Sequence, residues 1–99
     1  MIGILENEMS EQEFMSLVKE KLSVPAIRHS ELLNRPIKKV ALCGGSGSFL
    51  INDAKRCKAD VYLTADVKYH EFFDADNEIL ILDAGHFETE QFTKQLFAD

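Results

Sequence analysis

The sequence predicts an α/β fold, a single domain in which helices flank a mainly parallel or mixed sheet. Strand-like apolar runs alternate with helix-like patterns along the whole chain, which is typical of this class. The runs are almost continuously apolar, as expected for strands that are covered on both faces. The 99 residues, 45% of them apolar, are enough for one core and too few for two. We therefore expect one domain at residues 1–99.

The N-terminal part predicts a strand and then a helix. Ile2–Leu5 is a short apolar run, which an acidic turn at Glu6–Glu8 should end. Ser10–Glu13 (Ser-Glu-Gln-Glu) has the pattern of a capping box, so a helix should begin there. Pro25 should close it. One stripe of this helix follows from three- and four-residue spacing: Phe14, Leu17, Val18, Lys21 and Leu22.

The middle of the chain predicts a strand, a glycine turn and a helix. A short strand at Val24–His29 and a turn at Asn34–Pro36 precede a buried strand at Lys38–Cys43. The turn is Gly44–Ser48 (Gly-Gly-Ser-Gly-Ser), because glycine accepts the backbone angles that tight turns need. The next helix should end near Lys58.

The C-terminal part continues the alternation. Asp60–Thr64 predicts a strand, Val67–Asp74 a helical segment, and Glu78–Leu82 the most apolar strand of the chain. A last helix is expected from about His86 to Phe97.

Composition limits the partners and the compartment. Seventeen acidic against eleven basic residues give a net charge of -6, a field that repels phosphate backbones, so we expect no nucleic acid partner. No apolar run approaches the roughly 20 residues that span a bilayer, and the first residues lack the features of a secretory signal. We expect no membrane partner and a cytoplasmic location. Cys43 and Cys57 should be buried or half-buried free thiols.

Three loops directly follow predicted strands: Gly44–Ser48, Ala65–His70 and Asp83–Glu90. In open α/β sheets, ligands bind at the carboxyl ends of the strands. We therefore expect the three loops to form one shared site.

The third loop carries a candidate metal-binding pair. His86 and Glu90 lie four residues apart at the start of a predicted helix, so both side chains should leave one face, and Gly85 permits the turn out of the strand. An imidazole and a carboxylate suit zinc, manganese or iron better than calcium. A site of this kind needs at least three protein ligands. The alternative is structural: His86 begins a helix, Asp83 caps it, and Glu90 lies on a solvated face.

The other two loops carry weaker signals. Asp66, Lys68, Tyr69 and His70 fall within five positions, and a histidine in a cleft is a candidate for proton transfer. The alternative is an ordinary charged helix start that Asp66 caps. Gly44–Ser48 resembles an anion-binding turn. It lacks a Walker lysine and the G-x-G-x-x-G spacing, so tight packing is the alternative.

Three segments, in this order, resemble the C-terminal portion of the NIF-3-like (NGG-1 interacting factor 3) family: Val40–Ser48, Thr64–His70 and Asp83–Glu90. Met1–Leu5 is similar to the segment with which that portion begins. Bacterial members are often labelled GTP cyclohydrolase I type 2 homologues. The resemblance covers nearly the whole chain. It implies that residues 1–99 are the C-terminal lobe, one half of a two-lobed fold, and that an N-terminal lobe is its partner.

The resemblance also implies a site. Family members hold two divalent metal ions in a cleft between the lobes and assemble as a homohexameric ring. His86 and Glu90 match the family's Gly-His-x-x-x-Glu ligands, while Asp66, Lys68 and His70 match cleft-lining residues and are the catalytic candidates. The remaining ligands, a His-His motif and an Asp, come from the N-terminal lobe. This sequence has no His-His motif and none of the ligands of that lobe, so its own metal affinity should be weak.

The implied function is a metal-dependent hydrolase or cyclohydrolase, active only as the full-length protein, in which bridging water becomes a hydroxide nucleophile. One alternative is a non-enzymatic scaffold or protein-interaction module whose lobes the metals hold together. Another is a nucleotide-binding domain that uses Gly44–Ser48.

Overall fold

The computed structural model describes residues 2–24, 26–46, 51–65, 67–75 and 78–85. Strands and helices alternate along the chain, as predicted. None of the helices in these ranges has the length and apolarity that crossing a bilayer would require. The elements are β1 (Ile2–Met9), α1 (Glu11–Leu22), β2 (Arg28–His29), β3 (Ile37–Ser46), α2 (Ile51–Arg56), β4 (Val61–Ala65), the 3-10 helix η2 (Tyr69–Ala75) and β5 (Leu80–Asp83).

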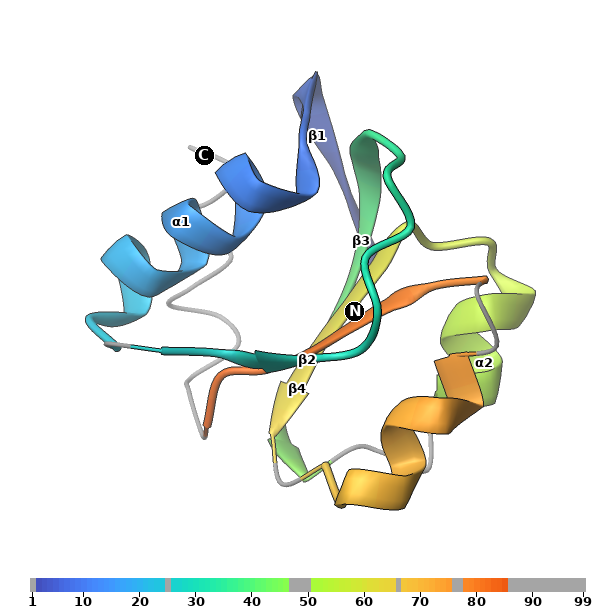
Figure 1. Ribbon diagram of the computed structural model, residues 1–99. Helices are drawn as coiled ribbons and strands as arrows, with labels where there is room; N and C mark the ends of the chain where they lie inside the picture. Colours follow the sequence, from blue (N-terminus) through green and yellow to red (C-terminus); the bar gives the residue numbers. More distant parts are fainter. Residues whose placement is uncertain (1, 25, 47–50, 66, 76–77, 86–99) are drawn as a thin grey trace.

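The strands form one five-stranded mixed sheet with the order β1-β3-β4-β5-β2. The three central strands are parallel, whereas β1 and β2 pair antiparallel at the two edges. Helix α1 lies on one face of the sheet, and α2 and η2 lie on the other (Figure 1). The predicted α/β class is confirmed.

Each face of the sheet has its own apolar core, because successive side chains of a strand point to opposite faces. On the α1 face, Phe14 and Val18 pack with Leu63 and Leu82. On the other face, α2 and η2 cover alternate residues of the same strands, such as Tyr62 and Ile81. Every residue of β4 and of β5 is buried. The prediction from the continuously apolar runs is confirmed.

Helix α1 begins as predicted and ends earlier than predicted. The Ser10 hydroxyl accepts from the Glu13 amide at 3.1 Å, and the Glu13 carboxylate accepts from the Ser10 amide at 2.9 Å. The helix ends at Leu22, not at Pro25, because Ser23 adopts the left-handed conformation (φ 56°). Its amide and that of Val24 bond back to the last turn, as in common helix C-termini.

Strand β1 corrects the prediction of an acidic turn at Glu6–Glu8, since it continues to Met9. Its partner is β3, with Ile2 opposite Ala41 and Met9 opposite Ile37, and the register is irregular in between. An edge strand tolerates charged residues because one side of it meets solvent. The acidic residues lie within the irregular stretch, and pairing with β3 resumes at Met9, so the chain stays extended where a turn was expected.

Other elements also begin or end at residues that differ from the predicted ones. The strand predicted at Val24–His29 is only β2, Arg28–His29. Strand β3 runs through Gly44–Ser46, the first part of the predicted glycine turn. Its register with β4 shifts between Leu42 and Ser46, and the pairing resumes where Ser46 meets Ala65. Helix α2 ends at Arg56, shortly before Lys58, which is left-handed (φ 59°). The last helix predicted, about 86–97, lies outside the described residues.

Both cysteines are free thiols, as predicted. Cys43 is half-buried. Cys57, which directly follows the end of α2, is exposed, and this corrects the expectation of burial.

Candidate functional site

The three parallel strands end at one edge of the sheet. Ser46 of β3 pairs with Ala65 of β4, and Thr64 of β4 pairs with Asp83 of β5. The Ala84 amide donates to the Thr64 carbonyl at 3.1 Å, which extends the pairing one residue beyond β5. The loops that follow these strands therefore leave from the same edge, as predicted.

Asp83, the last residue of β5, organises this edge. Its carboxylate is nearly buried. One oxygen, Oδ2, accepts from the Val67 amide at 3.0 Å, and the other, Oδ1, accepts from the Gly85 amide at 3.0 Å. Gly85 is left-handed (φ 76°), a conformation that favours glycine. A single carboxylate thus holds the start of the loop after β4 and the turn after β5.

Arg28, which the sequence reasoning missed, reaches the same carboxylate from β2. Its Nη2 donates to Asp83 Oδ2 and, at 2.7 Å, to the Val67 carbonyl. The guanidinium carbon lies 5.7 Å from the centroid of the Phe72 ring in η2, within the range of a cation–π contact. No local sequence motif predicts this role, because Arg28 lies opposite Asp83 only through the antiparallel pairing of β2 with β5.

The surroundings of Asp83 favour its ionised form. Burial by itself raises the pKa of the carboxyl. The Gly85 amide, the Arg28 guanidinium and the Val67 amide together overcome that effect, so the pKa of Asp83 lies below its usual value. An ionised carboxylate accepts these bonds more strongly than a neutral acid would.

Two of the predicted site residues lie among the described residues. Lys68 directly follows Val67; its side chain is exposed, and its amide donates to Glu71 Oε1 at 2.7 Å. His70 lies in η2, and its side chain is outside the described part of the structure. Asp66 also lies outside it.

Both predicted metal ligands, His86 and Glu90, lie outside the described residues, so their roles stay predictions. Within the described ranges no three His, Cys, Asp or Glu side chains are grouped so that they could hold a metal ion. Of the predicted anion-binding turn, Gly44–Ser46 belongs to β3, and the two residues after it are not described.

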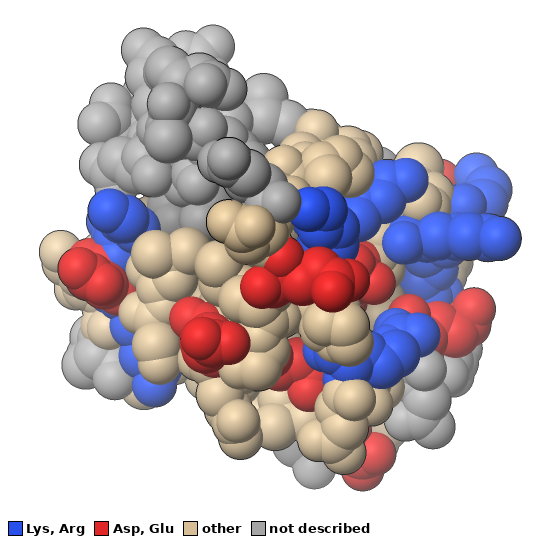
Figure 2. Space-filling model, turned by 90° about the horizontal axis from the view of Figure 1, so that it is seen from above, with Lys and Arg blue, Asp and Glu red and all other residues tan. Residues whose placement is uncertain are grey.

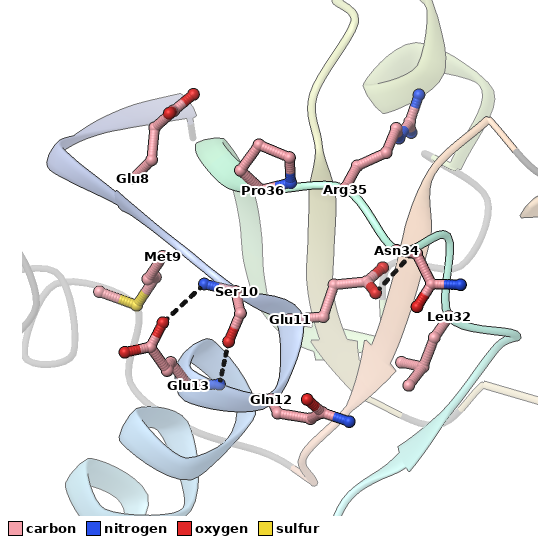
Figure 3. A pocket seen from close by; sticks show the side chains of 10 residues that line it. All are labelled: Glu8, Met9, Ser10, Glu11, Gln12, Glu13, Leu32, Asn34, Arg35 and Pro36. Atoms are coloured by element: carbon pink, nitrogen blue, oxygen red, sulfur yellow. Dashed lines mark hydrogen bonds between the residues drawn. The ribbon is translucent and has the colours of Figure 1, made fainter.

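The opposite edge of the sheet carries a groove of about 430 Å³, shown in Figure 3. Its polar groups hold the fold. Ser10 and Glu13 form the capping box, and the Glu11 carboxylate accepts from the amides of Leu33 at 2.8 Å and Asn34 at 2.9 Å. The groove is lined by Glu8, Met9, Ser10, Glu11, Gln12, Glu13, Leu32, Asn34, Arg35 and Pro36.

Basic and acidic side chains lie side by side over the face in Figure 2. The expectation that nucleic acid is not a partner still rests on the net charge of -6.

Comparison with known proteins assigns the family. The sequence matches the family described as Duf34/NIF3 (NGG1p interacting factor 3) over residues 1–99. A "GTP cyclohydrolase 1 type 2 homolog" of Campylobacter jejuni is 39% identical over 95 residues, which are 95% of this chain and 38% of the relative. A protein of the same name from Bacillus subtilis is 42% identical over 87 residues, 87% of this chain and 23% of the relative.

Solved structures agree. A Bacillus cereus protein related to NIF3 superposes with a TM-score of 0.81 at 39% identity, covering 96% of this chain and 28% of that one. A Staphylococcus aureus hypothetical protein, SA1388, superposes with a TM-score of 0.80 at 30% identity, covering 96% and 32%. The chain spans well under half the length of these relatives, and it belongs to the Duf34/NIF3 family.

Proposed function

We propose that this chain is the C-terminal lobe of a longer protein and supplies part of a dinuclear metal site, with His86 and Glu90 as ligands. The observation that carries the proposal is the turn at Asp83–Gly85. The carboxylate of Asp83 holds the Gly85 amide at the carboxyl edge of the parallel strands, one residue before His86. The Val67 amide is bound to the same carboxylate, so the loop that bears Lys68 begins beside it.

The donor set fits borderline divalent cations. An imidazole and a carboxylate are ligands of zinc, manganese and iron in proteins. Two ligands are fewer than such a site requires, so the proposal needs further ligands from the N-terminal lobe. The length of the relatives supports this, since the chain covers 38% of the Campylobacter protein.

For the intact protein we propose metal-dependent hydrolysis of the cyclohydrolase type, in line with the names of the bacterial relatives. A bound metal pair supplies activated water and polarises the substrate. The exposed ammonium of Lys68 binds an anionic group of the substrate, His70 transfers protons, and Asp66 orients the loop or accepts a proton. We further propose a cytoplasmic homohexamer, as the family resemblance implies.

The test uses the intact protein, purified with and without a chelator and then reloaded with zinc, manganese or iron. Hydrolysis is assayed over a panel of nucleotides and phosphoesters. We expect the chelator to abolish turnover, and we expect H86A and E90Q to weaken metal binding at least about tenfold, as even outer-shell changes commonly do. H29A and E20Q are the matched controls, since His29 and Glu20 are exposed on β2 and α1. Equal metal affinity in H86A, E90Q and wild type contradicts the ligand assignment.

A second candidate function is a metal-stapled scaffold for protein partners. The family's description, NGG1p interacting factor 3, names an interaction instead of a reaction. Metal binding that depends on His86 and Glu90, together with a blank panel of substrates, would favour this function over hydrolysis.

A further inference from the structure

We propose that Arg28 is a positioning residue, which fastens the loop after β4 to the turn after β5 so that Val67 and Gly85 are held in one arrangement. Its purpose rests on the function proposed above. The coupling of the two segments is a separate claim about described residues, so it can be tested by itself.

Two segments of the chain are bound to one side chain. Val67 and Gly85 lie 18 positions apart in sequence, yet their amides donate to different oxygens of the Asp83 carboxylate. A carboxylate rotating about its side-chain bond would move both acceptors together. Whatever holds Asp83 in one orientation therefore holds both segments.

Arg28 binds both Asp83 and Val67. Its Nη2 contacts Asp83 Oδ2, the oxygen that also receives the Val67 amide, and donates to the Val67 carbonyl at 2.7 Å. Val67 is thus bound through both its amide and its carbonyl. Its side chain is buried in the core on the α2 and η2 face of the sheet. Arg28 and Asp83 together clamp the backbone immediately before Lys68.

The Phe72 ring helps to orient the Arg28 guanidinium. Its guanidinium lies over the Phe72 ring at 5.7 Å, and Phe72 belongs to η2, the element that follows the clamped loop. A planar guanidinium stacks on an aromatic ring and presents its donors in a fixed direction, whereas the ammonium of lysine is a flexible point charge. Lysine at this position should therefore replace the charge and lose part of the orientation.

The exposure of Arg28 indicates that it positions the two segments and does not stabilise the whole fold. The Arg28 side chain is 61% exposed, against 6% for Asp83. Ion pairs with an exposed partner contribute little to global stability. Removing Arg28 should accordingly loosen the two segments locally while the sheet stays folded. A simple stabiliser of the edge strand would instead weaken β2, β5 and the clamped segments to the same extent.

The first measurement is amide hydrogen exchange, by NMR, in wild type, R28Q and R28K. In R28Q the Val67 and Gly85 amides should exchange about two- to tenfold faster, the range for losing one hydrogen bond, and R28K should fall in between. The Ala84 amide, which is bound to the Thr64 carbonyl at 3.1 Å, should not change. R35Q is the matched control, since exposed Arg35 donates to the Glu78 carbonyl at 2.7 Å, away from this edge.

Unchanged exchange at Val67 and Gly85 in R28Q overturns the proposal. An equal acceleration at Val67, Gly85 and Ala84 also overturns it, because that result indicates a general loss of stability.

The second measurement is a Co²⁺ absorbance titration of the intact protein. Co²⁺ affinity should fall about tenfold in R28Q and stay at the wild-type value in R35Q, with the two variants melting at the same temperature. Wild-type protein that fails to bind Co²⁺ counts against the proposed metal site, while the exchange data still decide on the clamp. Wild-type affinity in R28Q, despite faster exchange, overturns the positioning role.

Discussion

A carboxylate accepts from two backbone amides at each edge of the sheet: the amino edge, where the parallel strands begin, and the carboxyl edge, where they end. At the amino edge, the buried Glu11 carboxylate accepts from the amides of Leu33 and Asn34, two neighbours in one connection. At the carboxyl edge, the Asp83 carboxylate accepts from Val67 and Gly85, which belong to different connections, and it also binds a side chain that is 61% exposed. The first carboxylate shapes a loop, whereas the second joins two loops that flank the proposed site.

This difference indicates that a bound carboxylate is not by itself a sign of function. Glu11 and Asp83 are both almost buried. What distinguishes Asp83 is its position at the carboxyl end of a central parallel strand, where ligands bind in folds of this class. The variants below separate the two edges by asking which one supports stability alone.

The largest loss of stability should come from E11A. The substitution leaves the Leu33 and Asn34 amides without the carboxylate that they donate to, and bonds to charged groups are the stronger ones. We expect the free energy of unfolding to fall by about 2 to 4 kcal/mol, measured by urea denaturation. E20A is the control, since Glu20 is exposed on the same helix. A loss no greater than that of E20A would remove the structural role of Glu11.

D83N should cost less stability and disturb the site more. Asparagine keeps one acceptor oxygen, so either the Val67 or the Gly85 amide loses its partner, and the ion pair with Arg28 is lost. We expect unfolding to become easier by about 1 to 3 kcal/mol. We also expect faster amide exchange in the segments around Val67 and Gly85. In E11A those segments should exchange as in wild type after correction for global stability. If D83N and E11A accelerated exchange around Val67 and Gly85 equally, the claim that only Asp83 joins these two segments would be contradicted.

S10A sharpens the account of the amino edge. The Ser10 hydroxyl accepts from the Glu13 amide at 3.1 Å, and losing an N-cap costs about 1 kcal/mol. Thermal or urea unfolding measures the loss. S16A is the control, because Ser16 is exposed within α1 and away from its cap. Equal stability of S10A and S16A would contradict the contribution of the capping box.

The smallest effect should be a difference in pH dependence at the carboxyl edge. The pKa of Asp83 is lower in the folded protein than its ordinary value of 3.8. Its contribution to stability is therefore present above that ordinary value and is lost as the pH falls through the folded pKa. Wild type should lose more stability than D83N when the pH is lowered from about 5 to below the ordinary pKa. Urea denaturation across this range measures it, and parallel curves for the two proteins would contradict the assignment.

Features encoded by neighbouring residues were predictable. The capping box at Ser10 and Glu13 is a pattern four residues long, and the structure contains both of its bonds. The central strands β4 and β5 were predictable because only strands covered on both faces are apolar throughout. The three central strands are parallel and end at one edge, so the edge proposed for the site followed from the order of the elements.

Features that depend on distant partners were not predictable. Acidic residues in β1 suggested a turn, yet the strand continues to Met9, where pairing with β3 resumes after an irregular stretch. Gly44 and Gly45 suggested a turn, yet both belong to β3, whose pairing with β4 resumes at Ser46 after an irregular stretch. A glycine or a glutamate leaves its backbone free to pair, so a neighbouring strand can override local preference.

Taken alone, the sequence determined the α/β class, the start of α1, the buried central strands and the edge at which the parallel strands end, because each depends on short-range periodicity or on element order. Tertiary structure alone decided that Arg28 would meet Asp83, 55 positions away. The physical reason is that β2 is a two-residue strand with no periodicity of its own. It acquires its place by pairing with β5, and only that pairing brings a cation to the carboxylate that joins the two loops.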